Sequence, residues 1–125
     1  MAKIGKAQAS QVETLEGSFE GHYEELEGYT VGFETYFEDS DIGPLFAGLP
    51  NDRCQCPHWG VVLKGTLIYK YGDGTQDVIT AGEAYYARPD HTPVLGKDTE
   101  VIEFSPTDQL RETIEVVTKN AANMA

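Results

Sequence analysis

The chain has 125 residues, of which 40% are hydrophobic, and this size and composition suit a single domain with one core. Its formal net charge of -12 disfavours binding to DNA or RNA, because phosphate backbones are recognised mainly by lysine and arginine. No segment is apolar over membrane-spanning length, and the first lysines precede no apolar stretch, so we expect a cytoplasmic protein that does not bind membranes.

The N-terminal third is polar at first and then favours strands. Residues 1–18 are weakly patterned and predict a loosely ordered arm or a strand that needs a partner to order it. Residues 28–37 are rich in aromatic and β-branched side chains, with apolar residues at alternate positions, as in a β-strand. Residues 41–52 contain several Gly and Pro residues and predict an irregular connection.

The middle of the chain predicts an all-β domain over residues 19–105. Short apolar segments separated by turn residues occupy positions 58–63, 66–71, 77–80, 84–87 and 100–104. Closely spaced strands of this kind indicate an antiparallel sandwich or barrel. Val61, Val62 and Leu63 are apolar at consecutive positions, so we expect both faces of their strand to be covered, by a second sheet and an end element or by a partner subunit.

A helix is expected at residues 106–125. Ser105 and Pro106 match the preferences for the N-cap and first helical positions, and Leu110, Ile114 and Val117 recur at helical spacing. A strand over residues 113–118 is the alternative, because that stretch is rich in β-branched residues.

The segment Cys54-Gln55-Cys56-Pro57-His58 is the strongest functional signal in the sequence. On an extended strand, side chains at alternate positions project from the same face, so both thiols and the imidazole would point the same way. Thiolate and imidazole together are ligands for zinc and some other transition metals. The cysteines, one residue apart, cannot join distant segments through a disulfide. They could instead be small buried residues in a barrel without metal.

Residues 54–106 resemble a small single-domain cupin. Two segments carry the resemblance: His58 to Tyr69, similar to the first cupin motif with its V-L-x-G turn at Gly65, and Ala81 to Pro93, similar to the second motif. The resemblance implies an antiparallel double-stranded β-helix, or jelly roll, usually assembled as a homodimer. It also implies a metal site, but the usual ligands differ here. His58 stands at the glutamate position, Cys54 and Asp52 at the two histidine positions, and Pro93 at the third histidine position.

His91 lies two residues before Pro93 and would share its face of an extended strand. We therefore predict a site formed by Cys54, Cys56, His58 and His91. Zinc suits this ligand set best, and iron, manganese and nickel are alternatives. Candidates to line the adjacent pocket are Tyr69, Tyr85, Tyr86, Arg88 and Glu103.

Three functional interpretations follow. With four protein ligands the metal would be a structural anchor in a barrel that binds or senses a small molecule. If Cys56 turned away because of Pro57, an open coordination position would suit a metal-dependent enzyme of the lyase, isomerase or dioxygenase type. A cysteine nucleophile with His58 as its base is the third, least supported interpretation, because no glycine-rich oxyanion loop accompanies the cysteines.

Overall fold

The computed structural model describes residues 2–124 and consists of two antiparallel sheets and one α-helix. The predicted arm over residues 1–18 and helix over 106–125 each extend one residue outside the described part. In spatial order, the larger sheet contains β1 (Gln11–Leu15), β2 (Phe19–Leu26), β3 (Tyr29–Tyr36), β10 (Thr99–Pro106), β5 (His58–Lys64) and β8 (Ala84–Ala87). The smaller sheet contains β4 (Ser40–Asp41), β9 (His91–Leu95), β6 (Thr66–Tyr71) and β7 (Gln76–Thr80).

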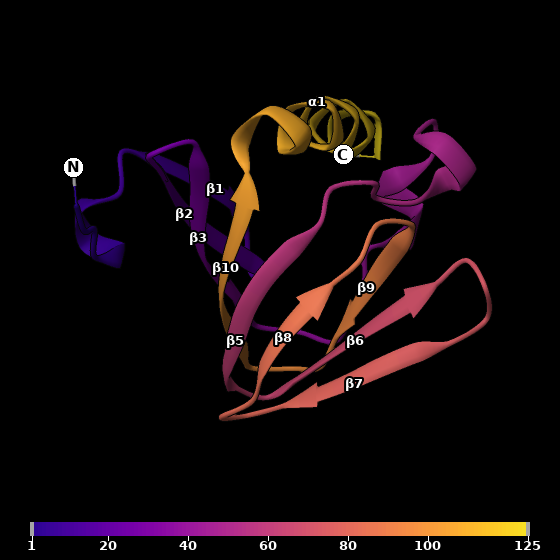
Figure 1. The fold of residues 1–125 in the computed structure, drawn as a ribbon, viewed down its shortest axis with the longest axis horizontal. Coiled ribbons are helices and arrows are strands. Elements are labelled where there is room, and N and C mark those ends of the chain that lie inside the picture. The colour runs from indigo at the N-terminus through magenta and orange to yellow at the C-terminus, as the bar shows by residue number, and fades with distance from the viewer. Residues whose placement is uncertain (1, 125) are drawn as a thin grey trace.

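The remaining elements lie between strands or at the ends of the chain. Three short 3-10 helices are η1 (Lys6–Gln8), η2 (Gly43–Phe46) and η3 (Pro50–Asp52), and the C-terminal helix is α1 (Thr107–Met124). The two sheets face each other, and α1 lies across one end of them (Figure 1). The expectation of a mostly β structure with antiparallel sheets is therefore confirmed, as is a helix at the C-terminal end.

The core lies between the two sheets because alternate residues of each strand point inward. Val62 and Val101 of the larger sheet pack with Leu67, Tyr69 and Leu95 of the smaller one, and all are at most 4% exposed. Gly65 permits the tight turn between β5 and β6. Its φ of +82° is in the left-handed region, and an added Cβ atom would lie 2.7 Å from the Cα atom of Thr99.

Helix α1 covers a second, smaller apolar cluster. Phe46, Leu49, Cys54 and Cys56 pack together under Leu110, Val116 and Val117 of the helix. The side-chain amide of Asn120 donates hydrogen bonds to the carbonyls of Leu45 and Ala47, at 2.7 and 2.9 Å. These contacts hold the helix against the segment that carries both cysteines.

The helix begins later than the sequence predicts. Ser105 and Pro106 belong to β10, where they pair with Thr30 and Tyr29, and the helix starts at Thr107. Ser105 is buried and its hydroxyl group contacts His58, so it cannot act as the predicted N-cap. The alternative strand over residues 113–118 is wrong, because this stretch lies within α1.

The N-terminal region contains two strands: β1, which agrees with the strand alternative for residues 1–18, and β2, which was not predicted. β1 pairs with β2 of the same chain over Gln11 to Leu15, and β2 in turn pairs with β3 along its whole length. β1 is exposed throughout and forms one edge of the larger sheet. Residues 11–15 therefore find their partner within the chain.

The outer face of the larger sheet carries large apolar side chains that residues 2–124 leave exposed. Val62 is fully buried on the inner face, but Leu63 on the outer face is 54% exposed. Trp59 and Tyr86 pack together on neighbouring strands of the same outer face, with ring centroids 5.0 Å apart, and both are exposed. The expected cover for this face is not supplied by the described residues.

Candidate metal centre

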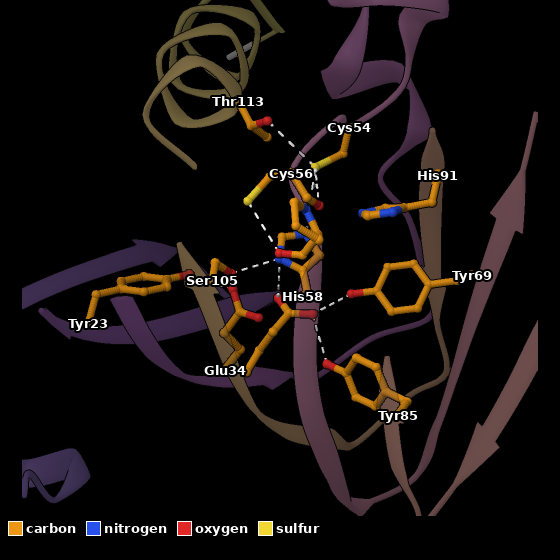
Figure 2. Close-up of polar contacts among 12 residues, drawn as sticks. Tyr23, Glu34, Cys54, Cys56, His58, Tyr69, Tyr85, His91, Ser105 and Thr113 are labelled. Atoms are coloured by element: carbon orange, nitrogen blue, oxygen red, sulfur yellow. Dashed lines mark hydrogen bonds and ion pairs between the residues drawn. The ribbon is translucent and has the colours of Figure 1, made fainter. Parts of the chain in front are cut away.

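Three of the four predicted ligands converge at one end of the space between the sheets. Cys54 forms an isolated antiparallel bridge with His91, with the amide of Cys54 donating to the carbonyl of His91 at 2.9 Å. His58 is the first residue of β5 and points inward beside them. One ligand atom from each of Cys54, His58 and His91 lies within 4.8 Å of the other two (Figure 2).

The orientation of His58 is fixed by a serine on the adjacent strand. Its Nδ1, which faces away from Cys54 and His91, forms a hydrogen bond of 2.7 Å with the hydroxyl group of Ser105. Its Nε2 then lies 3.6 Å from the sulfur of Cys54. A hydrogen bond to the non-ligating nitrogen is the usual arrangement for a metal-binding histidine, because it selects the tautomer and holds the ring in place.

His91 presents a nitrogen without a partner. Its Nδ1 donates a hydrogen bond to the carbonyl oxygen of Arg88 at 2.5 Å, so its Nε2 carries the free lone pair. The residue is only 1% exposed, and Nε2 has no hydrogen-bond partner among the described residues. A buried acceptor left unpaired is unfavourable by about 1 to 3 kcal/mol, and a metal ion at this point would satisfy it.

Burial sets the protonation of all three groups. It lowers the pKa of both His58 and His91 to about 3, so both imidazoles are neutral near pH 7, as metal ligands must be. The 3.9 Å approach of His58 Nδ1 to Glu103 is therefore not an ion pair at that pH. Burial raises the pKa of the Cys54 thiol to about 11, so a metal would have to displace its proton.

Cys56 does not join the group. The chain is bent at Cys56 and does not become a strand until His58, so the predicted alternation of three side chains on one face is not present. The sulfur of Cys56 lies 3.4 Å from the carbonyl oxygen of Pro57 and points to the other side of the segment from His91 (Figure 2). Asp52, at one of the cupin histidine positions, instead accepts a hydrogen bond from the amide of Gly48 at 3.0 Å.

Two carboxyl groups, those of Glu34 and Glu103, lie near His58 (Figure 2). Glu103 of β10 accepts hydrogen bonds from Tyr85, at 2.7 Å, and from Tyr69, both on Oε1. Glu34 of β3 accepts one from Tyr23 on Oε2 at 2.6 Å. Glu34 is not among the pocket residues that the sequence predicts. Glu34 and Tyr36 are two positions apart in residues 28–37, and this spacing was the available signal that Glu34 shares the inward face of Tyr36.

The two carboxyl groups influence each other's ionisation. Burial, followed by the charge of Glu103, raises the pKa of Glu34 to about 8. Burial also raises the pKa of Glu103, although Tyr69 and Tyr85 oppose this by donating hydrogen bonds to its ionised form. Glu34 therefore holds a proton near pH 7.

A cavity of about 760 Å³ opens beside the candidate ligands. Cys54, His58 and His91 line it, and so do three of the predicted pocket residues, Tyr69, Tyr85 and Glu103.

The other two predicted pocket residues do not line this cavity. Arg88 is exposed, forms a 2.9 Å ion pair with Asp73 and lies 3.7 Å above the ring of Tyr71. Tyr86 is 49% exposed and belongs to the outer face.

Among residues 2–124, no helix is long and apolar enough to cross a membrane.

Comparison with known proteins relates the chain to others by structure alone. No protein-family model matches the sequence, and no curated protein matches it. A solved structure from Rhizobium leguminosarum bv. viciae 3841, of unknown function, has a TM-score of 0.56 at 19% identity and covers 84% of this chain and 94% of its own. An RmlC-like cupin from Shewanella frigidimarina has a TM-score of 0.53 at 16% identity, covering 84% of this chain and 89% of its own.

The Fe(II) form of HppE is a larger protein of similar fold. It has a TM-score of 0.56 at 10% identity, and the match covers 84% of this chain but 59% of HppE. Likeness at this level of identity concerns the fold. The sequence resemblance to cupins is thus confirmed at the level of structure: the chain has a cupin-like β fold that holds a Cys/His/His group.

Proposed function

We propose that Cys54, His58 and His91 bind one divalent transition metal ion, and that the protein uses it on a small molecule bound in the adjacent cavity. The observation that carries the proposal is the convergence of three buried ligand atoms within 4.8 Å, one of them a histidine nitrogen without a partner. A group that served only packing would not leave this acceptor unsatisfied.

Zinc is the metal that best fits the donors. One thiolate and two imidazoles belong to the nitrogen and sulfur ligand set that zinc prefers. Iron and nickel also accept imidazole, whereas manganese favours oxygen donors, which the three grouped residues do not supply. When bound, such an ion would act as a Lewis acid or activate water.

The number of ligands favours catalysis over a structural anchor. Structural zinc sites are closed by four protein ligands, whereas catalytic sites have three and keep one position open. Here the fourth predicted ligand, Cys56, points away, and the other three line a cavity large enough for a small organic molecule. A lyase or isomerase acting on a small molecule is therefore the activity we favour. A thiolate ligand argues against the oxygen chemistry of a dioxygenase.

A barrel that binds or senses a small molecule without reaction is the second candidate. It would require Cys56 to rotate toward the metal and close the coordination shell. The burial of Cys56 next to Cys54 keeps this candidate open.

The arrangement of the sheets and the assembly of the protein can be inferred further. We infer that the two sheets form the cupin double-stranded β-helix, and that the protein is cytoplasmic and homodimeric. The apolar outer face of the larger sheet, with Trp59, Leu63 and Phe104 all at least 41% exposed, supports a dimer that buries it.

Isothermal titration of zinc into chelator-treated protein tests the metal proposal. We expect binding of one ion per chain that is lost in His91→Ala and retained in His22→Ala, a histidine on β2 outside the group. Elemental analysis of protein purified without chelator should find the same stoichiometry. Zinc binding that is equal in His91→Ala and the unmodified protein would contradict the assignment.

A further inference from the structure

The lining of the cavity is strongly acidic. Its acidic and basic residues are Glu13, Glu34, Asp39, Asp41, Glu103, Glu115 and Arg111, so six acidic side chains accompany one basic side chain. Arg111 lies on α1, is 63% exposed and forms a 3.4 Å ion pair with Asp108. Arg111 is the one lysine or arginine among the residues that line the cavity.

The two interior carboxyl groups each keep one oxygen open. Both hydrogen bonds to Glu103 fall on Oε1, and the hydrogen bond to Glu34 falls on Oε2. The other oxygen of each group makes no hydrogen bond to the described residues. Neither of these two oxygens is fully buried, because His91 Nε2 is the one fully buried side-chain nitrogen or oxygen that lacks a hydrogen-bond partner in residues 2–124. Both open oxygens can therefore accept a hydrogen bond from a molecule in the cavity.

The rest of the wall is largely apolar. Phe19, Leu67, Leu95 and Val101 contribute side chains from both sheets. At the end occupied by the cysteine and histidine group, His91, whose buried Nε2 has no hydrogen-bond partner among the described residues, also lines the cavity. A ligand that fits these surroundings has an apolar body, hydrogen-bond donors directed at the carboxyl groups, and no negative charge near them.

We propose that the cavity binds an organic ammonium ion, a small molecule whose apolar body lies between the sheets and whose protonated amine donates to Glu103 and Glu34. This deepens the proposed function by naming its ligand class, and it rests on that function for the role of the cavity. A protonated amine supplies three donors and a positive charge, matching two open carboxyl oxygens.

Anionic ligands are disfavoured by the same residues. Placing a carboxylate or phosphate in the metal-free cavity would bring it close to Glu103, and repulsion between like charges is strong where water is excluded. It would also lose its hydration without gaining a cationic partner.

Binding of three probes with a common apolar body tests this inference. The probes are 2-phenylethylamine, 2-phenylethanol and phenylacetate, titrated at pH 7 into the full chain, first metal-free and then with zinc, with affinity measured by ligand-observed NMR. In the metal-free protein we expect the amine to bind at least ~10-fold more tightly than phenylacetate, with the alcohol between them. Phenylacetate binding as tightly as the amine, or no binding of any probe, would overturn the inference.

Variants locate the site. In the double variant E34Q/E103Q the preference for the amine should fall to within about threefold, whereas E25Q, on the exposed part of β2, should keep it. A preference that persists in a folded double variant contradicts the assignment to Glu34 and Glu103. Should the double variant fail to fold, the three-probe comparison in the unmodified protein decides the ligand class. Failure of zinc to bind while the amine preference holds would contradict the metal proposal and support the ligand class.

Discussion

Replacing Glu34 with glutamine should stabilise the protein, by an amount that grows as the pH rises from 5 to 8. Glu34 lies between the sheets with its carboxyl group facing the cavity, and its pKa is raised from 4.5 to about 8. Between these two values the folded chain holds a proton on Glu34 that the unfolded chain has lost. The contribution of Glu34 to the free energy of unfolding therefore falls as the pH rises from 4.5 to 8, in proportion to this difference in bound protons. The buried histidines His58 and His91 contribute in the opposite direction below about pH 6.5, so the difference between E34Q and the unmodified protein isolates Glu34.

The size of the effect follows from the pKa. Each tenfold change in proton affinity corresponds to about 1.4 kcal/mol, and pH 7 lies 2.5 units above 4.5, so holding the proton at pH 7 is unfavourable by at most ~3.5 kcal/mol. Glutamine has nearly the same shape as the protonated acid and can accept the hydrogen bond from Tyr23. We expect E34Q to raise the free energy of unfolding at pH 7 by about 2 kcal/mol, since water in the cavity will lessen the burial of the carboxyl group.

Urea unfolding of metal-free protein, followed by the fluorescence of Trp59, measures this change. Curves at pH 5, 7 and 8 should show that the stability gained by E34Q over the unmodified protein grows as the pH rises. Glu25→Gln, which alters an exposed carboxylate on the neighbouring strand, provides the matched control and should behave like the unmodified protein. Equal pH dependence in E34Q and the unmodified protein would refute the assignment of a buried proton to Glu34.

Three further predictions concern the metal site and the assembly. Cys54→Ala should weaken zinc binding at least ~100-fold, more than the loss of a residue that only positions a ligand. Cys56→Ala, which replaces an equally buried thiol, should change the zinc affinity by no more than about threefold. Equal losses of affinity in calorimetry would show that both thiols bind. Ser105→Ala should weaken zinc binding ~10- to 100-fold by releasing the ring of His58, and an unchanged affinity would exclude that role for the serine. Sedimentation should find a dimer that Trp59→Glu converts to a monomer, and a monomeric unmodified protein would contradict the proposed interface.

Local pattern was sufficient for much of the strand framework. The segments predicted at residues 66–71 and 84–87 match β6 and β8 to the residue, because apolar and β-branched residues there are bounded by glycine turns. β2 was not predicted because Glu20, Glu24 and Glu25 gave it the composition of a solvated surface. Its strand character depends on pairing with β3, and that tertiary contact is not visible in local composition.

The candidate site was predictable in its members but not in its geometry. Counting alternate positions put Cys54, Cys56 and His58 on one face, but the chain is not extended at Cys56, so only Cys54 and His58 meet. The position of His91 depends on a bridge between segments far apart in the sequence, and its choice came from the resemblance to cupins. Glu34 was missed because an acidic residue among many others carries no mark of burial.

Cobalt(II) titration of chelator-treated Cys56→Ala protein tests whether Cys54, His58 and His91 form one metal centre. Cobalt commonly replaces zinc, and thiolate coordination gives it a charge-transfer absorption band. We expect this band to saturate at one cobalt ion per chain, because Cys54 is the only remaining thiol, and we expect His91→Ala in the same background to abolish it. Absence of the band in folded Cys56→Ala protein would contradict a metal centre formed by Cys54, His58 and His91.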